Sequence, residues 1–276
     1  MKLKAADRTW RVGVYLLITL AALVTLMPLV WLVASTFKSK EDLFHYMFFS
    51  PRLSVSSYSS LFASRPSFLR SLINSTFVSC AVVLTQLFFA SLAGFALAKY
   101  EFRGKKIIML LMLSTMLIPG QVIMAPLYTL LYRMGLVDTY LGLIIPGAVS
   151  VFGVFLFRQS MLQVPTELLH AARIDGCTEF RVYWDVIMPV VRPMVGAFCL
   201  LSFMGAWNNF LWPQILIQHS ERYTLPIFLN QFRDVYTQQY GALMAGTMLS
   251  ILPVVVLFFA LQKEFVAGLT SGAVKG

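Results

Sequence analysis

The sequence predicts an all-α polytopic membrane protein with six transmembrane helices, and two observations support this prediction. Hydrophobic residues make up 58% of the 276 residues and charged residues only 12%, whereas a soluble domain averages about 25% charged residues. Six long intervals contain no Lys, Arg, Asp or Glu, and each is long enough for a helix to cross a bilayer core of about 30 Å. An ordinary soluble enzyme, a disordered chain and a disulfide-rich scaffold are therefore excluded.

The six charge-free intervals define the expected spans, all within a single transmembrane permease domain of residues 1–276. The spans cover residues 13–36, 71–98, 107–132, 139–157, 194–217 and 241–262. The first interval is too long for the apolar part of a signal peptide, and no small-residue cleavage site follows it. We therefore expect it to remain as a membrane helix, with a kink at Pro28.

The third and fourth intervals contain residues that interrupt helices, namely Pro119, Gly120, Pro126, Pro146 and Gly147. Broken helices often line a transport pathway. Pro and Gly are also frequent in membrane helices in general. The pattern therefore predicts bends and gives only weak evidence for a pathway.

Basic residues predict which side of the membrane each loop occupies. The N-terminus, the 99–106 and 158–192 loops and the C-terminal tail together hold 14 Lys and Arg, against eight on the other side. Because cytoplasmic loops carry the excess of Lys and Arg, both termini should be cytoplasmic. The same bias accounts for the net charge of +10, so nucleic acid is not an expected partner.

The sequence contains no source of energy for active transport. The six spans hold no Lys, Arg, Asp or Glu, which argues against a proton-coupled carrier but leaves sodium coupling open. No phosphate-binding G-x-x-x-x-G-K-[ST] motif and no HExxH motif occurs, so we expect neither an ATPase nor another enzyme. The three cysteines and three histidines have no ligand spacing, so we expect no metal site.

Residues 165–176, in the longest inner loop, predict a short helix that cannot span. Pro165 suits the beginning of a helix and Gly176 suits its end. About eleven residues give a length of about 16 Å. Ala171, Ala172 and Gly176 leave one side nearly flat, so another backbone can approach it. On these residues alone, an amphipathic helix on the membrane face is the simpler alternative to a docking helix.

This segment resembles the cytoplasmic signature of binding-protein-dependent ABC importer permeases. That signature is Glu-Ala-Ala, three residues, Gly, nine residues and Ile-x-Leu-Pro. The same spacing runs here from His170 through Gly176 to Pro189. The stretches 207–213 and 268–276 resemble the carbohydrate branch of the family, and the chain is similar along its length to the smaller maltose-type permease subunit. His170 replaces the usual Glu, and Glu167 lies three residues before it on the same helical face.

The resemblance implies a permease subunit of a carbohydrate ABC importer in the inner membrane. The implied partners are a second permease of different sequence, two ATP-binding subunits that hold ATP and Mg²⁺, and an extracytoplasmic solute-binding protein. No cofactor is expected on this chain. The implied ATPase-coupling residues are Glu167, His170, Ala171, Ala172, Asp175, Gly176 and Pro189.

The resemblance also implies roles for the tail and for an outer loop. Thr270, Ser271 and Lys275 would contact the ATPase pair, whereas a disordered end is the simpler interpretation of such a tail. The polar segment 218–240 would face the solute-binding protein, and from its residues alone it is an exposed loop.

Trp207, Asn208 and Asn209 form the main polar and aromatic cluster within a span. Sugars stack on aromatic rings and form hydrogen bonds with amides, so one interpretation places these residues and Gln121 on the solute pathway. The other interpretation is structural. Trp207 would anchor its helix at the membrane interface, and the Asn residues, Gln86 and Gln121 would form hydrogen bonds between helices.

Other functions remain open. Within the same type of importer, glycerol phosphate is an alternative solute. A self-sufficient secondary carrier, or a membrane-anchored assembly protein without a pathway, would belong to other classes.

Overall fold

The computed structural model describes the backbone of residues 2–64, 67–233 and 239–270, and the side chains of residues 10–64, 67–233 and 239–268. The regular elements within these ranges are helices, accompanied by one isolated β-bridge between Lys38 and Leu53. The predicted all-α class is therefore confirmed. The chain forms two compact units, residues 1–68 with 229–251 and residues 69–228 with 252–276.

The first unit combines the N-terminus with a later segment. Its helices are α1 (Lys2–Thr36), α2 (Ser56–Ala63), η4 (Gln231–Arg233) and the first part of α14 (Tyr240–Thr270). α2 and α14 pack closely at Gly241, where a Cβ atom would lie 2.6 Å from the Ser57 hydroxyl oxygen. The loop after α1 is organised by Lys38, which is 1% exposed and donates to the carbonyls of Tyr46 at 2.7 Å and Met47 at 3.2 Å. Burial lowers the pKa of Lys38.

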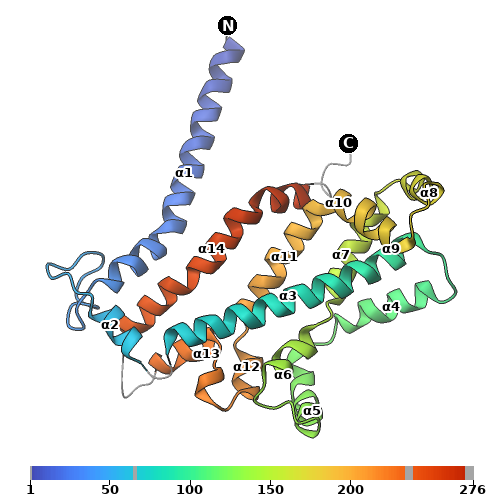
Figure 1. Cartoon of the computed structure of the whole chain (residues 1–276). Helices are drawn as coiled ribbons and strands as arrows, with labels where there is room; N and C mark the ends of the chain where they lie inside the picture. Colours follow the sequence, from blue (N-terminus) through green and yellow to red (C-terminus); the bar gives the residue numbers. More distant parts are fainter. Residues whose placement is uncertain (1, 65–66, 234–238, 271–276) are drawn as a thin grey trace. The chain divides into compact units, whose positions relative to one another are not determined.

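The second unit contains most of the helices and, as described below, the candidate sites. In chain order they are α3 (Phe68–Lys99), α4 (Lys105–Thr115), α5 (Gly120–Arg133), α6 (Tyr140–Ile144), η1 (Ile145–Gly147), α7 (Val151–Leu162), α8 (Thr166–Ile174), α9 (Glu179–Arg181), η2 (Val182–Ile187), α10 (Met188–Val190), α11 (Arg192–Trp207), α12 (Leu211–Leu216), η3 (Ser220–Arg222), α13 (Leu225–Asn230) and the last part of α14. Figure 1 shows α3 running the length of this unit, with α8 and α9 near its C-terminal end.

Two buried clusters form the core of the second unit. The cluster at the C-terminal half of α3 joins α7, α8, η2 and α11. Gly94 allows α3 to approach α7 here, since a Cβ atom would lie 2.9 Å from the backbone nitrogen of Arg158. The other cluster joins the N-terminal half of α3 to α5, α6 and α12 through residues such as Val78, Leu143 and Leu216.

Three of the predicted spans are single long helices, the third and fourth contain bends, and a further bend precedes the fifth. The long apolar helices are Trp10–Thr36, Phe68–Lys99 and Tyr240–Gly268. The third span bends by 97° between α4 and α5, where Pro119 precedes α5 in an extended conformation. The pair formed by α6–η1 and α7 bends by 44°, and the run Glu179–Val190 meets α11 at 81°. By length and composition alone, the described residues provide three spans, or up to six if each bent pair is counted as one; the fifth predicted span is also covered by α11 and α12 without the run Glu179–Val190.

The fifth predicted span, residues 194–217, is not one continuous helix. α11 ends at Trp207 and α12 begins at Leu211. Pro213 contributes to this break, because it has no N–H to pair with the carbonyl of Asn209 in a continuous helix.

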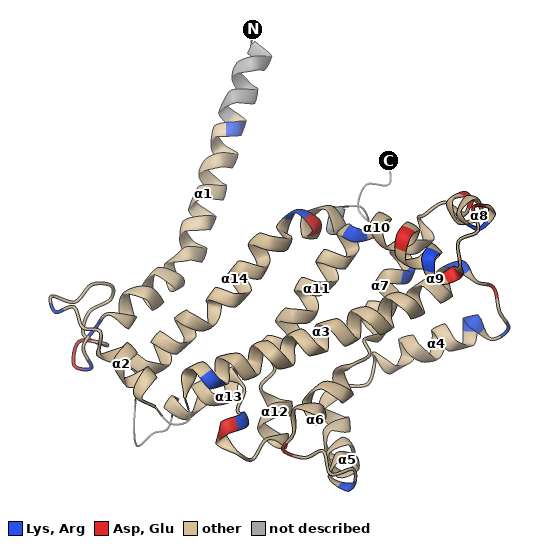
Figure 2. Ribbon diagram, viewed as in Figure 1, with Lys and Arg blue, Asp and Glu red and all other residues tan. Residues whose placement is uncertain are grey.

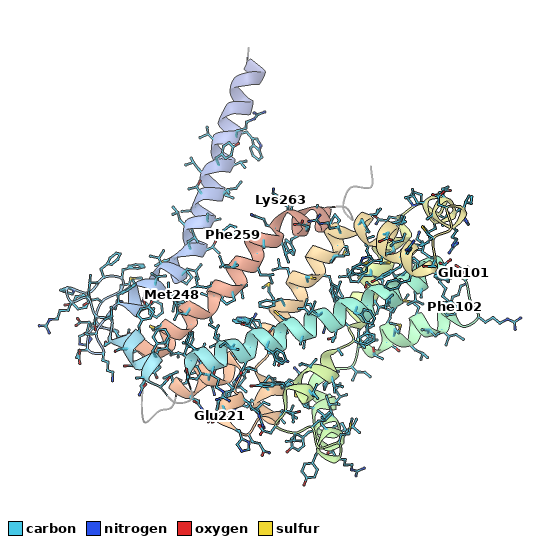
Figure 3. All side chains as sticks on the ribbon, viewed as in Figure 1. Glu101, Phe102, Glu221, Met248, Phe259 and Lys263 are labelled. Atoms are coloured by element: carbon cyan, nitrogen blue, oxygen red, sulfur yellow. The ribbon has the colours of Figure 1, made fainter. Side chains whose placement is uncertain are left out.

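Charged residues lie near the ends of the long helices of the second unit. The middle parts of α3, α11 and α14 carry none, as Figure 2 shows. Glu101 and Phe102 follow the C-terminal end of α3, whereas Glu221 lies toward its other end (Figure 3). This distribution is the one expected for helices that cross an apolar bilayer core.

Candidate functional site

α8 is a short helix with a fixed end. It lies within the predicted range 165–176, with Pro165 directly before it. Gly176 has a φ of +80°, and its N–H donates to the carbonyl of Arg173 at 3.1 Å. The N–H of Cys177 donates to the carbonyl of Ala172 at 3.0 Å. These two bonds form a Schellman motif, which stops the helix and fixes the direction of the chain after it.

The two sides of α8 differ in burial. Leu169 and Ala172 are buried at 3% and 8% exposure and pack in the core cluster. Leu168 is 44% exposed and Ile174 is 85% exposed. We call the exposed side the α8 surface, and it consists of Glu167, Leu168, His170, Ala171, Ile174 and Asp175. The flat side expected at Ala171 and Ala172 is thus divided, because Ala172 faces the core.

A polar cluster connects α8 to α9 and to the end of α3. Arg173 donates two hydrogen bonds to Glu179, at 2.8 Å and 3.1 Å, and the hydroxyl of Tyr100 donates to the same carboxylate. Burial and the nearby Glu179 carboxylate raise the pKa of Tyr100. The ammonium of Lys99 donates to the carbonyl of Val164 at 2.5 Å. α8 is therefore attached at both ends to neighbouring elements.

The last signature residue, Pro189, lies exposed in α10, just after the π-helical turn η2. Because Pro189 has no N–H, the carbonyl of Asp185 has no α-helical donor at that position. Of the predicted tail residues, Thr270 is the last residue of α14, and its side chain is outside the described residues. Ser271 and Lys275 also lie outside them.

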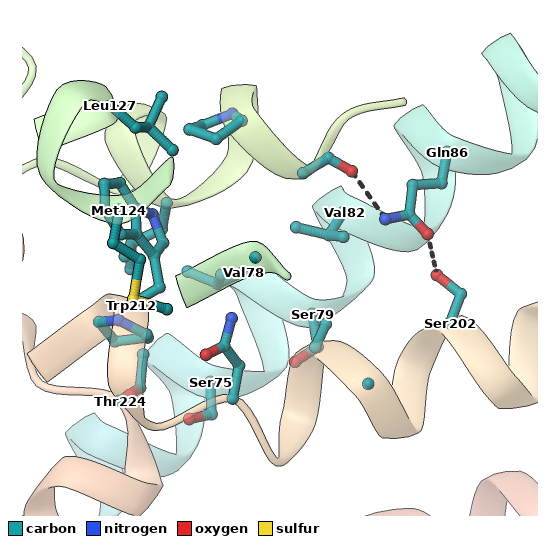
Figure 4. A pocket seen from close by; sticks show the side chains of 18 of the residues that line it. Ser75, Val78, Ser79, Val82, Gln86, Met124, Leu127, Ser202, Trp212 and Thr224 are labelled. Carbon is teal, nitrogen blue, oxygen red and sulfur yellow. Dashed lines mark hydrogen bonds between the residues drawn. The ribbon is translucent and has the colours of Figure 1, made fainter. Parts of the chain in front are cut away.

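A partly open cavity of about 360 Å³ lies between helices of the second unit (Figure 4). Helices α3, α5, α6, α11 and α12 surround it. Most of its surface is apolar, and its polar side chains are Ser75, Ser79, Gln86, Ser202, Asn209, Trp212 and Thr224. Among the described residues, no charged side chain lines it.

Gln86 connects three walls of this cavity. Its amide nitrogen donates to the carbonyl of Gly147 at 2.7 Å, and its amide oxygen accepts from the Ser202 hydroxyl at 2.6 Å (Figure 4). Both polar ends of the Gln86 side chain are thus used within the protein. This favours the helix-packing interpretation for Gln86.

Thr224 lines the cavity but keeps its hydroxyl buried. Its side chain is 4% exposed, and its hydroxyl oxygen is buried without a hydrogen-bond partner. A buried hydroxyl without a partner costs free energy. The neighbouring Ser75 hydroxyl accepts from the N–H of Leu225 at 2.6 Å.

The four predicted pathway residues are placed differently from one another. Asn209 lines the cavity. Trp207 is 4% exposed and stacks on Phe203, with ring centroids 5.4 Å apart. Asn208 donates from its side chain to the carbonyl of Met204 at 2.9 Å, and Gln121 is exposed outside the lining. We did not predict Ser75, Ser79 or Thr224, since nothing in the sequence distinguishes them from ordinary helix-packing hydroxyls.

A buried carboxylate holds the opposite end of the second unit. Asp138 has a φ of +58° and accepts the N–H groups of Gln218 at 3.0 Å and His219 at 3.1 Å. The side chains of His219 and Arg222 also contact its carboxylate. Burial opposes ionisation, but these donors and the Arg222 charge lower the pKa of Asp138 to about 2. We call this arrangement the Asp138 clasp, and it joins the α5–α6 loop to the loop after α12.

Comparison with known proteins places the chain among membrane transport proteins. The family model described as "Binding-protein-dependent transport system inner membrane component" matches residues 86–270. The arabinooligosaccharides transport system permease protein AraQ of Bacillus subtilis (strain 168) is 36% identical over 271 residues, covering 97% of this chain and 96% of the relative. The lactose transport system permease protein LacG of Rhizobium radiobacter is 30% identical over 267 residues, covering 95% of each chain.

Solved structures share the fold. A chain of a bacterial ABC transporter involved in the import of the acidic polysaccharide alginate has a TM-score of 0.83 and 22% identity, covering 94% of this chain and 98% of that chain. A chain of a bacterial alginate ABC transporter, in complex with an alginate pentasaccharide-bound periplasmic protein, has a TM-score of 0.68 and 16% identity. At these identities the likeness concerns the fold alone.

Proposed function

Because this chain belongs to the family of binding-protein-dependent transport system inner membrane components, we propose that its α8 surface docks a separate ATP-binding subunit and that its cavity lines part of a carbohydrate pathway. The chain is a multi-pass inner-membrane permease subunit of a carbohydrate ABC importer. It is not an enzyme, because separate subunits of such importers hydrolyse ATP. A solute-binding protein works with it.

The observation that carries the docking proposal is the combination of rigidity and exposure in α8. A Schellman motif closes the helix, and its buried side is fixed in the core. Leu168 and Ile174 remain exposed and offer apolar contacts to a partner. When the ATP-binding subunits close on ATP, such a helix transmits their movement to the spans without bending. His170 and Glu167 stand beside these apolar residues and would meet polar groups of the partner.

The solute we propose is a neutral sugar or oligosaccharide. The relatives described above are named for arabinooligosaccharides and for lactose. The exposed amide of Asn209 suits sugar hydroxyls, and no charged side chain lines the described cavity. A phosphorylated solute would need cationic groups from elsewhere, and these relatives give the glycerol phosphate alternative no support.

The proposed assembly contains a second permease of different sequence and two ATP-binding subunits, which hold ATP and Mg²⁺. The most apolar window of Trp10–Thr36 has no buried residue within the chain, as expected for a helix that lipid and another subunit cover. We propose that both termini and α8 lie on the cytoplasmic side, in keeping with the excess of Lys and Arg there.

Purification from the native membrane in mild detergent tests the assembly, with mass spectrometry of the proteins that accompany the chain. We expect an ATP-binding subunit and a second permease. Reconstituted proteoliposomes should take up sugar only with ATP and the binding protein present. Recovery of the chain alone, with sugar uptake driven by an ion gradient in the absence of ATP, would contradict the proposal and identify a secondary carrier.

The variant Asn209→Leu tests the pathway within the same proteoliposomes. It replaces the exposed amide that lines the cavity by an apolar group of similar size, so the protein should keep its stability and lose sugar uptake at low sugar concentration. Asn208→Leu is the matched control, because the Asn208 side chain donates to the carbonyl of Met204 in the preceding helix. Unchanged uptake in Asn209→Leu would remove Asn209 from the pathway.

A further inference from the structure

We propose that the helical run Glu179–Val190 lies in the membrane–water interface and that its exposed aromatic pair, Phe180 and Trp184, inserts among lipid acyl chains just below the headgroups. The partner of this surface is lipid. The inference goes beyond the transport function and does not depend on which solute is carried.

The direction of the run supports this placement. It meets α11 at an angle of 81°. Membrane helices tilt on average by about 20° from the bilayer normal. A helix almost perpendicular to a transmembrane helix therefore runs close to the membrane plane, and Arg192, the first residue of α11, marks the level at which the chain turns into the membrane.

Burial divides the run into two sides. Val182, Tyr183 and Ile187 are 0%, 3% and 0% exposed and belong to the core cluster of the second unit. On the other side, Phe180 is 62% exposed and Trp184 is 58% exposed. Two large aromatic side chains that are exposed side by side mark a surface that contacts another protein or lipid.

The exposed side is itself divided into an apolar stripe and a charged stripe. The rings of Phe180 and Trp184 stack with a centroid distance of 6.5 Å and an interplanar angle of 6°, so the two residues form one surface. Arg181 and Asp185, also four residues apart, lie next to them and are exposed. A helix in the interface places its apolar stripe in the acyl chains and its charged stripe toward water. Trp is enriched at this depth because its large indole ring is mostly apolar but carries a polar N–H group.

Continuity with α11 makes lipid the favoured partner. The turn at Val191 joins the run directly to α11, whose exposed residues, such as Leu201 and Met204, lie within the predicted membrane span 194–217. The aromatic pair is therefore close to the bilayer by connectivity. In the competing arrangement, an ATP-binding subunit or a second permease covers Phe180 and Trp184. Quenching by lipid distinguishes the two arrangements.

Quenching of Trp184 fluorescence by brominated lipids tests the inference. The full chain, with the subunits that accompany it, is placed in nanodiscs of phosphatidylcholine or of phosphatidylcholine brominated near the headgroup end or near the methyl end of its acyl chains. Subtracting the emission of Trp184→Phe from that of the wild type isolates Trp184 from the other four tryptophans. We expect bromine near the headgroup end to remove the larger part of this difference emission, and bromine near the methyl end to remove less.

If neither brominated lipid quenches the difference emission, the inference is overturned. This result is expected if a protein subunit covers Trp184. Trp207→Phe is the matched control, because Trp207 is 4% exposed and its difference emission should not respond to bromine. If Trp184→Phe does not fold, Phe180→Trp provides a second reading. Its added emission should be quenched by bromine near the headgroup end, and an unquenched gain would contradict the proposal.

Discussion

The two ends of the second unit hold their loops with carboxylates in different environments. At the α8 end, Glu179 pairs with Arg173, and the two side chains are 51% and 35% exposed. At the other end, the Asp138 side chain is only 10% exposed and accepts from two backbone N–H groups and two side chains. Exposed pairs contribute about 0–1 kcal/mol, whereas hydrogen bonds to a charged group contribute about 1.5–3 kcal/mol.

The difference indicates which end is fixed. The Asp138 clasp holds two loops in one arrangement, and a change there requires the loss of the hydrogen bonds that a buried carboxylate accepts from two backbone N–H groups. The Arg173–Glu179 pair can exchange its partners for water at little cost, although α8 itself is stiff because a Schellman motif closes it. We therefore expect α8 to move as a rigid body together with the core cluster that holds its buried side, while the exposed Arg173–Glu179 pair adjusts at little cost.

The largest expected effect comes from removing the buried carboxylate. Asp138→Ala leaves the N–H groups of Gln218 and His219 without their charged acceptor, whereas the partly exposed guanidinium of Arg222 can turn to water, and the variant should lose about 1.5–3 kcal/mol of stability. Thermal unfolding of the purified protein measures this. Arg70→Gln is the matched control, since it breaks the exposed Arg70–Glu221 pair at 3.0 Å. Equal losses in the two variants would contradict the distinction between the ends.

The same clasp predicts a dependence on pH. The pKa of Asp138 is about 2 in the folded protein, and that of an unfolded Asp is about 3.9. The stabilisation is therefore fully present above about pH 4 and is lost as the pH falls through about 2. The difference in unfolding temperature between the wild type and Asp138→Asn should shrink over this range. Asn is suitable because it tolerates positive φ. A difference independent of pH would show that the charge is not the cause.

The next effect concerns the α8 surface. Ile174 is 85% exposed, so Ile174→Glu should change stability by no more than about 0.5 kcal/mol. If Ile174 enters a pocket of the ATP-binding subunit, the same variant weakens docking by about 2 kcal/mol or more, which is roughly 30-fold. The amount of ATP-binding subunit that copurifies measures this, with Ile174→Leu as the conservative control. Normal docking by Ile174→Glu would remove Ile174 from the contact.

A smaller effect is expected at the end of α8. Gly176 has a φ of +80°, and no atom lies within 4 Å of the position that a Cβ would take. Gly176→Ala should therefore cost about 1–2 kcal/mol from backbone strain alone. Gly176→Asn should cost less, since Asn visits this region more readily. A higher unfolding temperature for Gly176→Ala than for Gly176→Asn would show that the strain has another origin.

The smallest effect tests the exposed pair itself. Arg173→Gln or Glu179→Gln should each cost about 0.2–1 kcal/mol of stability, because both side chains are partly exposed. The double variant should cost little more than either single variant, as expected for partners in one interaction. A loss as large as that of Asp138→Ala, measured by the same thermal unfolding, would mean that the two ends are equally fixed.

Much of the fold was predictable from the sequence because a lipid environment requires long apolar helices. The charge-free intervals mark helices, and the limits of α8 follow from Pro165 and Gly176. The bends were harder to place. Pro119 indicated a break, and Pro193 in the first turn of α11 is a local signal for a new helix, but neither residue indicates the 81° angle of the turn before α11.

The candidate sites were only partly predictable. The exposed part of α8 was expected, but helical spacing alone did not indicate that Ala172 faces the core. The Asp138 clasp joins residues about eighty positions apart, so it was not evident in the sequence. Thr224 resembles any small polar residue until its unpartnered hydroxyl is seen beside the cavity. Long-range contacts of this kind arise from tertiary packing.

Photo-crosslinking from α8 tests the central claim most directly. A photoreactive amino acid replaces Ile174 in one variant and Leu141, which is 56% exposed on α6, in another. After irradiation of native membranes, adducts are identified by mass spectrometry. The account predicts that position 174 forms an adduct with an ATP-binding subunit and that position 141 does not. An ATP-binding subunit attached to position 141 and not to position 174 would contradict it.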